Sequence, residues 1–192
     1  MSAEGQNILN LFRQTRQVCE QVSLLLQTAD EQMKKADWKP DKSLAVSDMS
    51  YSVLSPTQWI PIAAFRYYFN QKYRNLIACV SVLLCDHFDE KYTLKEPVVT
   101  GLCFDYGKGH EETIYEYWYA RYFGYLSNNK PLELNGEPFE FDNRNVDQDH
   151  KGNFEKGVLF ALPLISLKNG QDVKLRVTDR LLGLLKDGTL SH

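Results

Sequence analysis

The sequence predicts an α+β fold, in which an antiparallel sheet of about five strands is accompanied by a long N-terminal helix, an aromatic helix and a C-terminal helix. Three patterns support this prediction. Apolar residues recur at steps of three and four over residues 6–35, which is the spacing of one helix face. Strand-length runs of alternating or continuous apolar residues follow, bounded by turn residues. A second helical stripe occupies residues 172–186.

The first helix is predicted over residues 6–35, because neither proline nor glycine interrupts this segment. Its apolar face repeats about every seven residues, as in the seam of a coiled coil or a helix bundle. We therefore expect this helix to pack on the domain's own sheet or on a second copy of the chain. Pro40 cannot continue the helix, and Trp38 is a candidate anchor on the domain. The apolar face consists of Ile8, Leu11, Phe12, Thr15, Val18, Cys19, Val22, Leu25, Leu26, Ala29 and Met33.

The middle of the chain alternates between strand and helix patterns. Residues 43–54 have a period of two, which predicts a half-buried strand. Residues 61–70 predict a short helix, although their aromatic rings also suit a strand. Residues 75–85 are apolar on both faces, so we expect a central strand that forms a hairpin with a strand at 97–106. Residues 111–126 predict the aromatic helix.

The last third of the chain contains one clear turn signal. Asn135-Gly136 lies between two alternating runs and predicts a type I′ turn joining two strands. Residues 157–162 predict a further strand, which Pro163 either ends or places at the sheet edge. The C-terminal helix is predicted over residues 172–186, followed by a stop at Asp187-Gly188.

Bulk composition indicates one globular domain spanning residues 1–192. Apolar residues make up 43% and charged residues 24% of the 192 residues, which is the balance of a globular protein. The net charge of −3 argues against nucleic acid as a partner. No apolar run is long enough to span a membrane, and we expect no secretory signal. Four cysteines without a C-x-x-C pair predict reduced thiols and a cytoplasmic location.

Metal and catalytic motifs are weak. Residues 147–152 resemble the start of a calcium loop, but Lys151 and Val158 occupy positions that need oxygen ligands. A carboxylate-type metal site would draw on acidic residues near strand ends. We expect no metal, no cofactor and no catalytic residue in this chain. The acidic candidates that remain are Asp86, Asp89, Asp105, Glu133, Glu140 and Glu155.

The aromatic clusters are the least ordinary feature of the sequence. Rings alternate with cations over residues 65–74 and again over residues 115–125. Such a combination can stack on bases or bind a planar anionic ligand. The alternative is that the rings pack between sheet and helix with their hydroxyls at the rim. The candidate ligand-binding residues are Arg66, Tyr67, Tyr73, Trp118, Arg121 and Tyr122.

The length of the first helix suggests the function. A helix of about 30 residues exceeds what a small sheet needs, and its seam suits a partner. We therefore expect a non-catalytic regulatory or interaction protein, which binds a protein partner or forms a homo-oligomer through this helix and binds a ligand through its aromatic surface or a pocket. The alternative is a metal-dependent hydrolase or nuclease that uses a carboxylate cluster.

Overall fold

The computed structural model describes residues 2–41, 46–47, 61, 63–85, 94–105, 133–142 and 156–186. One antiparallel sheet has the strand order β1–β3–β4–β5–β7–β6, and β2 also pairs with β3. The predicted α+β class is confirmed. The short strand β2 falls within the strand predicted over residues 43–54, the rest of which lies outside the described residues, and the short strand β1 was not predicted. The strands are β1 (Lys39–Pro40), β2 (Val46–Ser47), β3 (Ala63–Phe69), β4 (Leu76–Leu83), β5 (Val98–Asp105), β6 (Phe139–Asp142) and β7 (Lys156–Pro163).

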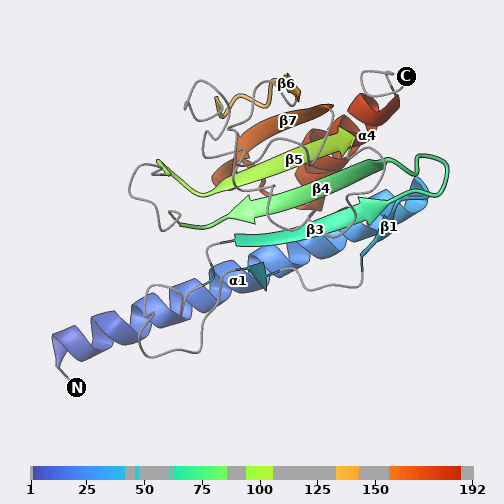
Figure 1. Ribbon diagram of the computed structural model, residues 1–192. Helices are drawn as coiled ribbons and strands as arrows, with labels where there is room; N and C mark the ends of the chain where they lie inside the picture. Colours follow the sequence, from blue (N-terminus) through green and yellow to red (C-terminus); the bar gives the residue numbers. More distant parts are fainter. Residues whose placement is uncertain are drawn as a thin grey trace.

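The helices of the described residues lie on one face of this sheet (Figure 1). The long helix α1 (Ala3–Lys35) crosses the β3 side. The C-terminal helix follows the short helical turn η5 (Leu164–Ser166). It comprises α3 (Gly170–Val173), a π-helical turn η6 (Lys174–Thr178) and α4 (Asp179–Lys186). Both predicted terminal helices are therefore confirmed, whereas the predicted aromatic helix over 111–126 lies outside the described residues.

The central position predicted for residues 75–85 is confirmed. All eight residues of β4 are buried, because helices cover one face and the opposite face is also apolar and closed to solvent. Its hairpin partner is β5, with Leu76 opposite Asp105 and Leu83 opposite Val98. The polar side chains Ser81 and Thr100 face each other in the opposite-face core and form a short hydrogen bond, which satisfies two buried hydroxyls.

The helix predicted over residues 61–70 is wrong, because β3 occupies most of this segment. Its side chains alternate between the two cores: Ala64 and Tyr68 join the helix-side core, and Phe65 and Tyr67 join the opposite one. A period of two that is buried on both faces favours a strand over a helix. The strong strand propensity of the rings points to the same result.

The type I′ turn predicted at Asn135-Gly136 is also wrong. Gly136 has a positive φ of 79°, but Asn135 does not share that conformation, and a type I′ turn needs both. The Asn135 side-chain oxygen instead accepts a hydrogen bond from Glu137 N, and Gly136 N donates to Ala161 O. The following strand, β6, pairs with β7, where Phe139 lies opposite Leu159.

Strand pairing and local hydrogen bonds determine where β7 ends and where the C-terminal helix begins. Pro163 ends β7, which lies between β5 and β6 and is not an edge strand. The C-terminal helix begins two residues before the predicted position, because the Asn169 side chain caps it by accepting from Gln171 N and Asp172 N. An asparagine in this position satisfies donors that the first turn leaves unpaired.

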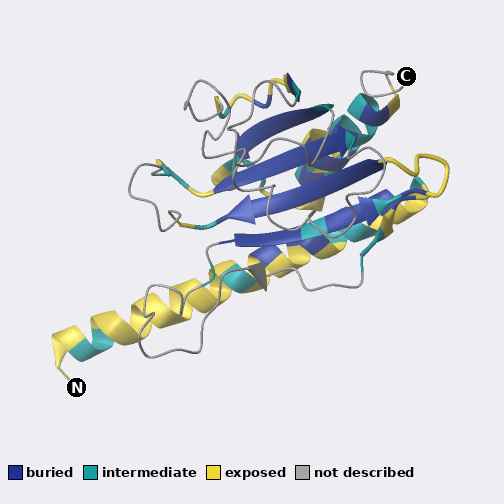
Figure 2. Ribbon diagram, viewed as in Figure 1, coloured by how far each residue is buried: buried dark blue, intermediate teal, exposed yellow. Residues whose placement is uncertain are grey.

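The described part of α1 is continuous from its cap at Ser2 to its end at Lys35. Its buried residues begin only at Val22, and they continue through Met33. At the C-terminal end Trp38 is buried, as expected for an anchor, and its ring stacks on Tyr73 at 6.0 Å. The N-terminal half of α1 projects beyond the sheet (Figure 2).

Candidate functional site

The projecting half of α1 exposes large apolar side chains. Ile8, Leu11, Phe12 and Val18 are 57%, 63%, 68% and 43% exposed, respectively. Exposed apolar residues are ordinary when they are scattered singly, but a contiguous group indicates an interaction site. We call these four residues the free stripe.

The free stripe is the continuation of the face that α1 buries against the sheet. Ile8 and Val22 differ by two heptads, as do Leu11 and Leu25, so each pair occupies one angular position on the helix. Val22 and Leu25 are buried in the helix-side core. One apolar face therefore serves the domain's own core at one end of α1 and faces solvent at the other.

Three of the four charged side chains in the projecting half lie off the free stripe, whereas Glu4 lies on the same face, one heptad before Leu11. Arg13, Arg16 and Glu20 are exposed on other faces of the helix, and Arg16 Nε lies 3.2 Å from Glu20 Oε1. The positions that flank the stripe include the uncharged Asn7 and Gln14. A partner helix would therefore meet an uncharged face between Ile8 and Val18, with the carboxylate of Glu4 at its N-terminal end.

A groove of about 550 Å³ opens at the base of the projecting half, between α1 and the segment that precedes the C-terminal helix. The α1 wall of the groove includes Val18 and Leu24, and the other wall includes Leu164 and Leu167. Val18 belongs to both the groove and the free stripe, so the two apolar surfaces are continuous. Leu24 is exposed.

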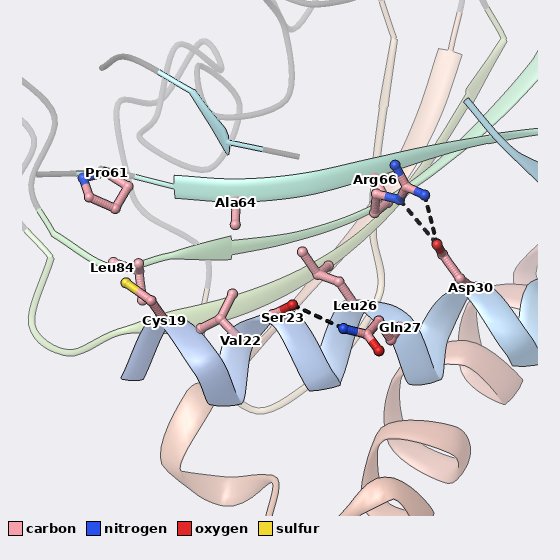
Figure 3. Close-up of a pocket in the computed structure, with 10 residues that line it drawn as sticks. All are labelled: Cys19, Val22, Ser23, Leu26, Gln27, Asp30, Pro61, Ala64, Arg66 and Leu84. Atoms are coloured by element: carbon pink, nitrogen blue, oxygen red, sulfur yellow. Dashed lines mark hydrogen bonds and ion pairs between the residues drawn. The ribbon is translucent and has the colours of Figure 1, made fainter. Parts of the chain in front are cut away.

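A second pocket, of about 240 Å³, lies between the packed half of α1 and the strands β3 and β4 (Figure 3). Apolar side chains form most of its lining, including Val22, Leu26 and Ala64. Asp30 and Arg66 stand together at one end of this pocket (Figure 3). Its size and lining suit a small, mostly apolar molecule with one polar end.

The polar end of this pocket is a three-residue contact. Arg66 donates from Nε to Asp30 Oδ1 at 3.2 Å and from Nη2 to Oδ2 at 2.7 Å. Tyr68 donates its hydroxyl to Asp30 Oδ1 at 3.0 Å. The hydrogen bonds that Arg66 donates to Asp30 raise the pKa of Arg66. Burial, followed by the charge of Asp30, raises the pKa of Tyr68 well above its usual value.

The structure separates the described members of the predicted ligand-binding set. Arg66 faces α1, whereas Tyr67 is 2% exposed in the core on the opposite face of the sheet. Tyr73 lies in the turn between β3 and β4, where it stacks on Trp38. The remaining predicted members, Trp118, Arg121 and Tyr122, lie outside the described residues. Ligand binding by the whole set stays a prediction.

The described residues contain no group of three or more His, Cys, Asp or Glu side chains able to hold a metal. Among the acidic candidates, Asp105 ends β5 opposite Lys156, and Glu140 on β6 pairs with Val158 on β7. Glu133 precedes the Asn135 turn and accepts from its amide. The other three acidic candidates, Asp86, Asp89 and Glu155, fall outside the described residues. No helix in the described part of the chain has the length and apolar character needed to cross a membrane.

Sequence reasoning missed two parts of this surface. Asp30 is not among the residues of the predicted apolar face of α1, yet it is the residue to which Arg66 donates. A single cation in an otherwise apolar strand was the signal that an acidic partner was needed. The far wall of the groove, Leu164 and Leu167, had no sequence signal, because only the chain's path brings it beside α1.

Comparisons of this chain with protein-family models, with curated proteins and with solved structures gave no match. The geometry therefore defines the class: an α+β domain whose first helix extends an apolar face beyond its own core.

Proposed function

We propose that this chain is a non-catalytic interaction protein, which binds a protein partner through the free stripe on α1. The observation that supports this proposal is the change in burial along one helix face, from Leu11 at 63% exposed to Leu25 at 7% exposed. The same apolar pattern is maintained over both halves, although the domain's own sheet covers only one of them.

The stability that a helix gains by burying its apolar face supports a partner for the projecting half. Helical segments of this length gain most of their stability in proteins from packing of an apolar face. Burying a Leu, Ile or Phe side chain fully contributes about 1.5–3 kcal/mol. Because the four stripe residues are already about half buried, covering them would contribute roughly 3–7 kcal/mol from this side. After the cost of association, this range suits a reversible complex.

A photo-crosslinking experiment tests the proposal in the cells that make the protein. A photoreactive phenylalanine analogue replaces Phe12 in one variant and Arg13 in another, because Phe12 lies on the free stripe and Arg13 on the other side of the same helical turn. We expect a protein adduct from position 12 and little from position 13. Equal adduct yields at the two positions, or none at either, would contradict the proposal.

The pocket beside Asp30 and Arg66 supports a second candidate function, the binding of a small apolar molecule with a polar end. Ala64 lines this pocket, so Ala64→Leu should narrow it. We expect octanoate or octylamine to raise the melting temperature of the wild-type protein but not that of Ala64→Leu. A melting temperature unaffected by either probe in the wild-type protein would argue against this candidate.

A further inference from the structure

We infer that the pocket between α1 and the strands β3 and β4 binds an uncharged amphiphile, an apolar chain that ends in a hydroxyl or a primary amide. This inference rests on the second candidate function proposed above, and it adds the charge and the hydrogen-bonding character of the ligand's polar end. It follows from the ion pair at one end of the pocket and from the apolar side chains at the other.

The pocket has an apolar end and a polar end. Cys19, Pro61 and Leu84 lie together at the apolar end, and Asp30 and Arg66 lie at the other (Figure 3). The stretch of α1 from Cys19 to Asp30 is about 16 Å long. At about 30 Å³ for a group the size of a water molecule, the volume of about 240 Å³ holds roughly eight such groups. An eight-carbon chain therefore has a suitable size.

Asp30 has room for one more hydrogen bond. A carboxylate offers about four acceptor positions, two on each oxygen. Oδ1 already accepts from Arg66 Nε and from the Tyr68 hydroxyl, and Oδ2 accepts from Arg66 Nη2. A ligand head that donates to Oδ2 fits this arrangement. A carboxylate head has no proton to donate and would bring a second negative charge beside Asp30.

The two charges at the polar end already balance each other. Asp30 and Arg66 are the charged residues among the described ones that line the pocket, and Arg66 Nη2 lies 2.7 Å from Asp30 Oδ2. The charge of Asp41 also acts on Arg66, but less strongly than Asp30 does. An ammonium head would compete with Arg66 for Asp30 and would lose hydration without gaining a counter-ion of its own. A hydroxyl or an amide donates to Asp30 without adding a charge.

A neutral polar group borders the same end of the pocket. Gln27 lines the pocket one turn before Asp30 on α1, and its Nε2 donates to Ser23 Oγ at 3.1 Å. The amide of Gln27 has a second N–H donor and an acceptor oxygen. A ligand head that both donates and accepts can therefore bond to Asp30 and to Gln27, which a hydroxyl or an amide does and an ether does not.

Protection of Cys19 from a thiol reagent ranks the ligands. Cys19 lines the pocket, and in a Cys85→Ser background the other two thiols are buried. At about pH 7 octanoate is anionic, octylamine is cationic and 1-octanol is uncharged. We expect 1-octanol to halve the rate of Cys19 modification at a concentration at least threefold lower than either charged probe requires. In the Ala64→Leu variant, 1-octanol should give no protection.

The isomeric ether 1-methoxyheptane separates hydrogen bonding from general apolar binding. It is uncharged, but it has no proton to donate, so it should protect Cys19 at least threefold less effectively than 1-octanol. If octanoate, octylamine or the ether protects as well as 1-octanol, the inference is overturned and the candidate function survives. Protection by none of the four probes would contradict both.

A charge-changing variant tests the part played by the ion pair. Asp30→Asn removes the carboxylate that balances Arg66, so the advantage of 1-octanol over octanoate should shrink at least threefold. Glu31→Gln removes the neighbouring exposed carboxylate and should leave that advantage within twofold of the wild-type value. Circular dichroism of both variants checks that the fold is retained. An advantage that is the same in Asp30→Asn and in the wild-type protein would overturn the inference.

Discussion

Arg66 Nη2 lies 2.7 Å from Asp30 Oδ2, and this ion pair joins strand β3 to helix α1. The second hydrogen bond, from Nε to Oδ1, makes the contact bidentate and therefore directional. Because it fixes the rotation of α1 about its axis at the sheet, it also fixes the direction in which the free stripe faces. The contact thus links the packed core to the proposed interaction surface.

Asp30→Asn should reduce the free energy of unfolding by about 1–3 kcal/mol, because it removes the charge that satisfies a partly buried guanidinium. The side chains of Arg66 and Asp30 are only 22% and 14% exposed. Urea unfolding followed by tryptophan fluorescence measures the change.

The matched control is Glu20→Gln, which removes an ion pair with Arg16 on the same helix. The side chains of Arg16 and Glu20 are 84% and 60% exposed, so the control should change the free energy of unfolding by less than about 0.5 kcal/mol. Equal losses in the two variants would show that burial does not set the strength of the Asp30 contact.

Tyr68 should make the protein less stable in alkaline solution. Its pKa is raised in the folded state by burial and by Asp30, so above about pH 10 the unfolded chain loses a proton that the folded chain retains. The contribution of Tyr68 to the free energy of unfolding is fully present below pH 10 and is lost as the pH rises further. At pH 7 the free energy of unfolding of Tyr68→Phe should be about 1 kcal/mol lower than that of the wild-type protein, because the variant loses the hydrogen bond to Asp30.

The slope of stability against pH distinguishes Tyr68→Phe from the wild-type protein. Between pH 10 and 11 its stability should fall by about 1 kcal/mol less than that of the wild-type protein, as measured by urea unfolding at each pH. Parallel curves for the two proteins would mean that Tyr68 titrates alike in both states.

The four thiols should react in an order set by burial. Burial raises the pKa of Cys79 and of Cys103, and the thiolate is the reactive form. Cys85 is exposed and Cys19 is partly exposed. We expect a chromogenic disulfide reagent to modify Cys85 first, Cys19 more slowly, and the two sheet thiols only after unfolding. Cys85→Ser should remove the fast phase; a fast phase that persists would assign it to another thiol.

Periodicity predicted the elements whose apolar pattern follows one rule along their length. The β4 segment is apolar on both faces and is central, and α1 follows its stripe from end to end. The segment that became β3 was harder, because Arg66 interrupts its apolar face and its partner Asp30 is 36 residues away. The sequence pattern of the ten residues around β3 therefore gives no sign of the residue that pairs with Arg66.

The candidate site was also only partly predictable from the sequence. The stripe was visible in the sequence, but which half of it is covered depends on where the sheet lies, and that is a tertiary property. Leu25 and Leu11 are equivalent by spacing, yet one is buried and the other exposed. The groove depends on Leu164, which the chain brings beside α1 only after β7 has been placed.

Gly101 should tolerate no side chain, because Phe160 lies directly opposite it on β7. A Cβ at Gly101 would lie 2.3 Å from Phe160 Cζ. The ring is fully buried and Arg180 lies over it, 5.5 Å from its centroid, so it has little freedom to move. Gly101→Ala should therefore cost about 1–3 kcal/mol through overpacking.

A double-mutant cycle with Phe160→Leu separates this clash from other effects. Because the smaller side chain makes room for the new methyl group, the double variant should be at least about 0.5 kcal/mol more stable than the sum of the single changes predicts. Gly183→Ala in α4 is the control: a Cβ there meets no atom within 4 Å, so it should stabilise the helix by about 0.5–1 kcal/mol. Additive losses in the cycle would place the cost of Gly101→Ala in the backbone of β5 and not in its contact with Phe160.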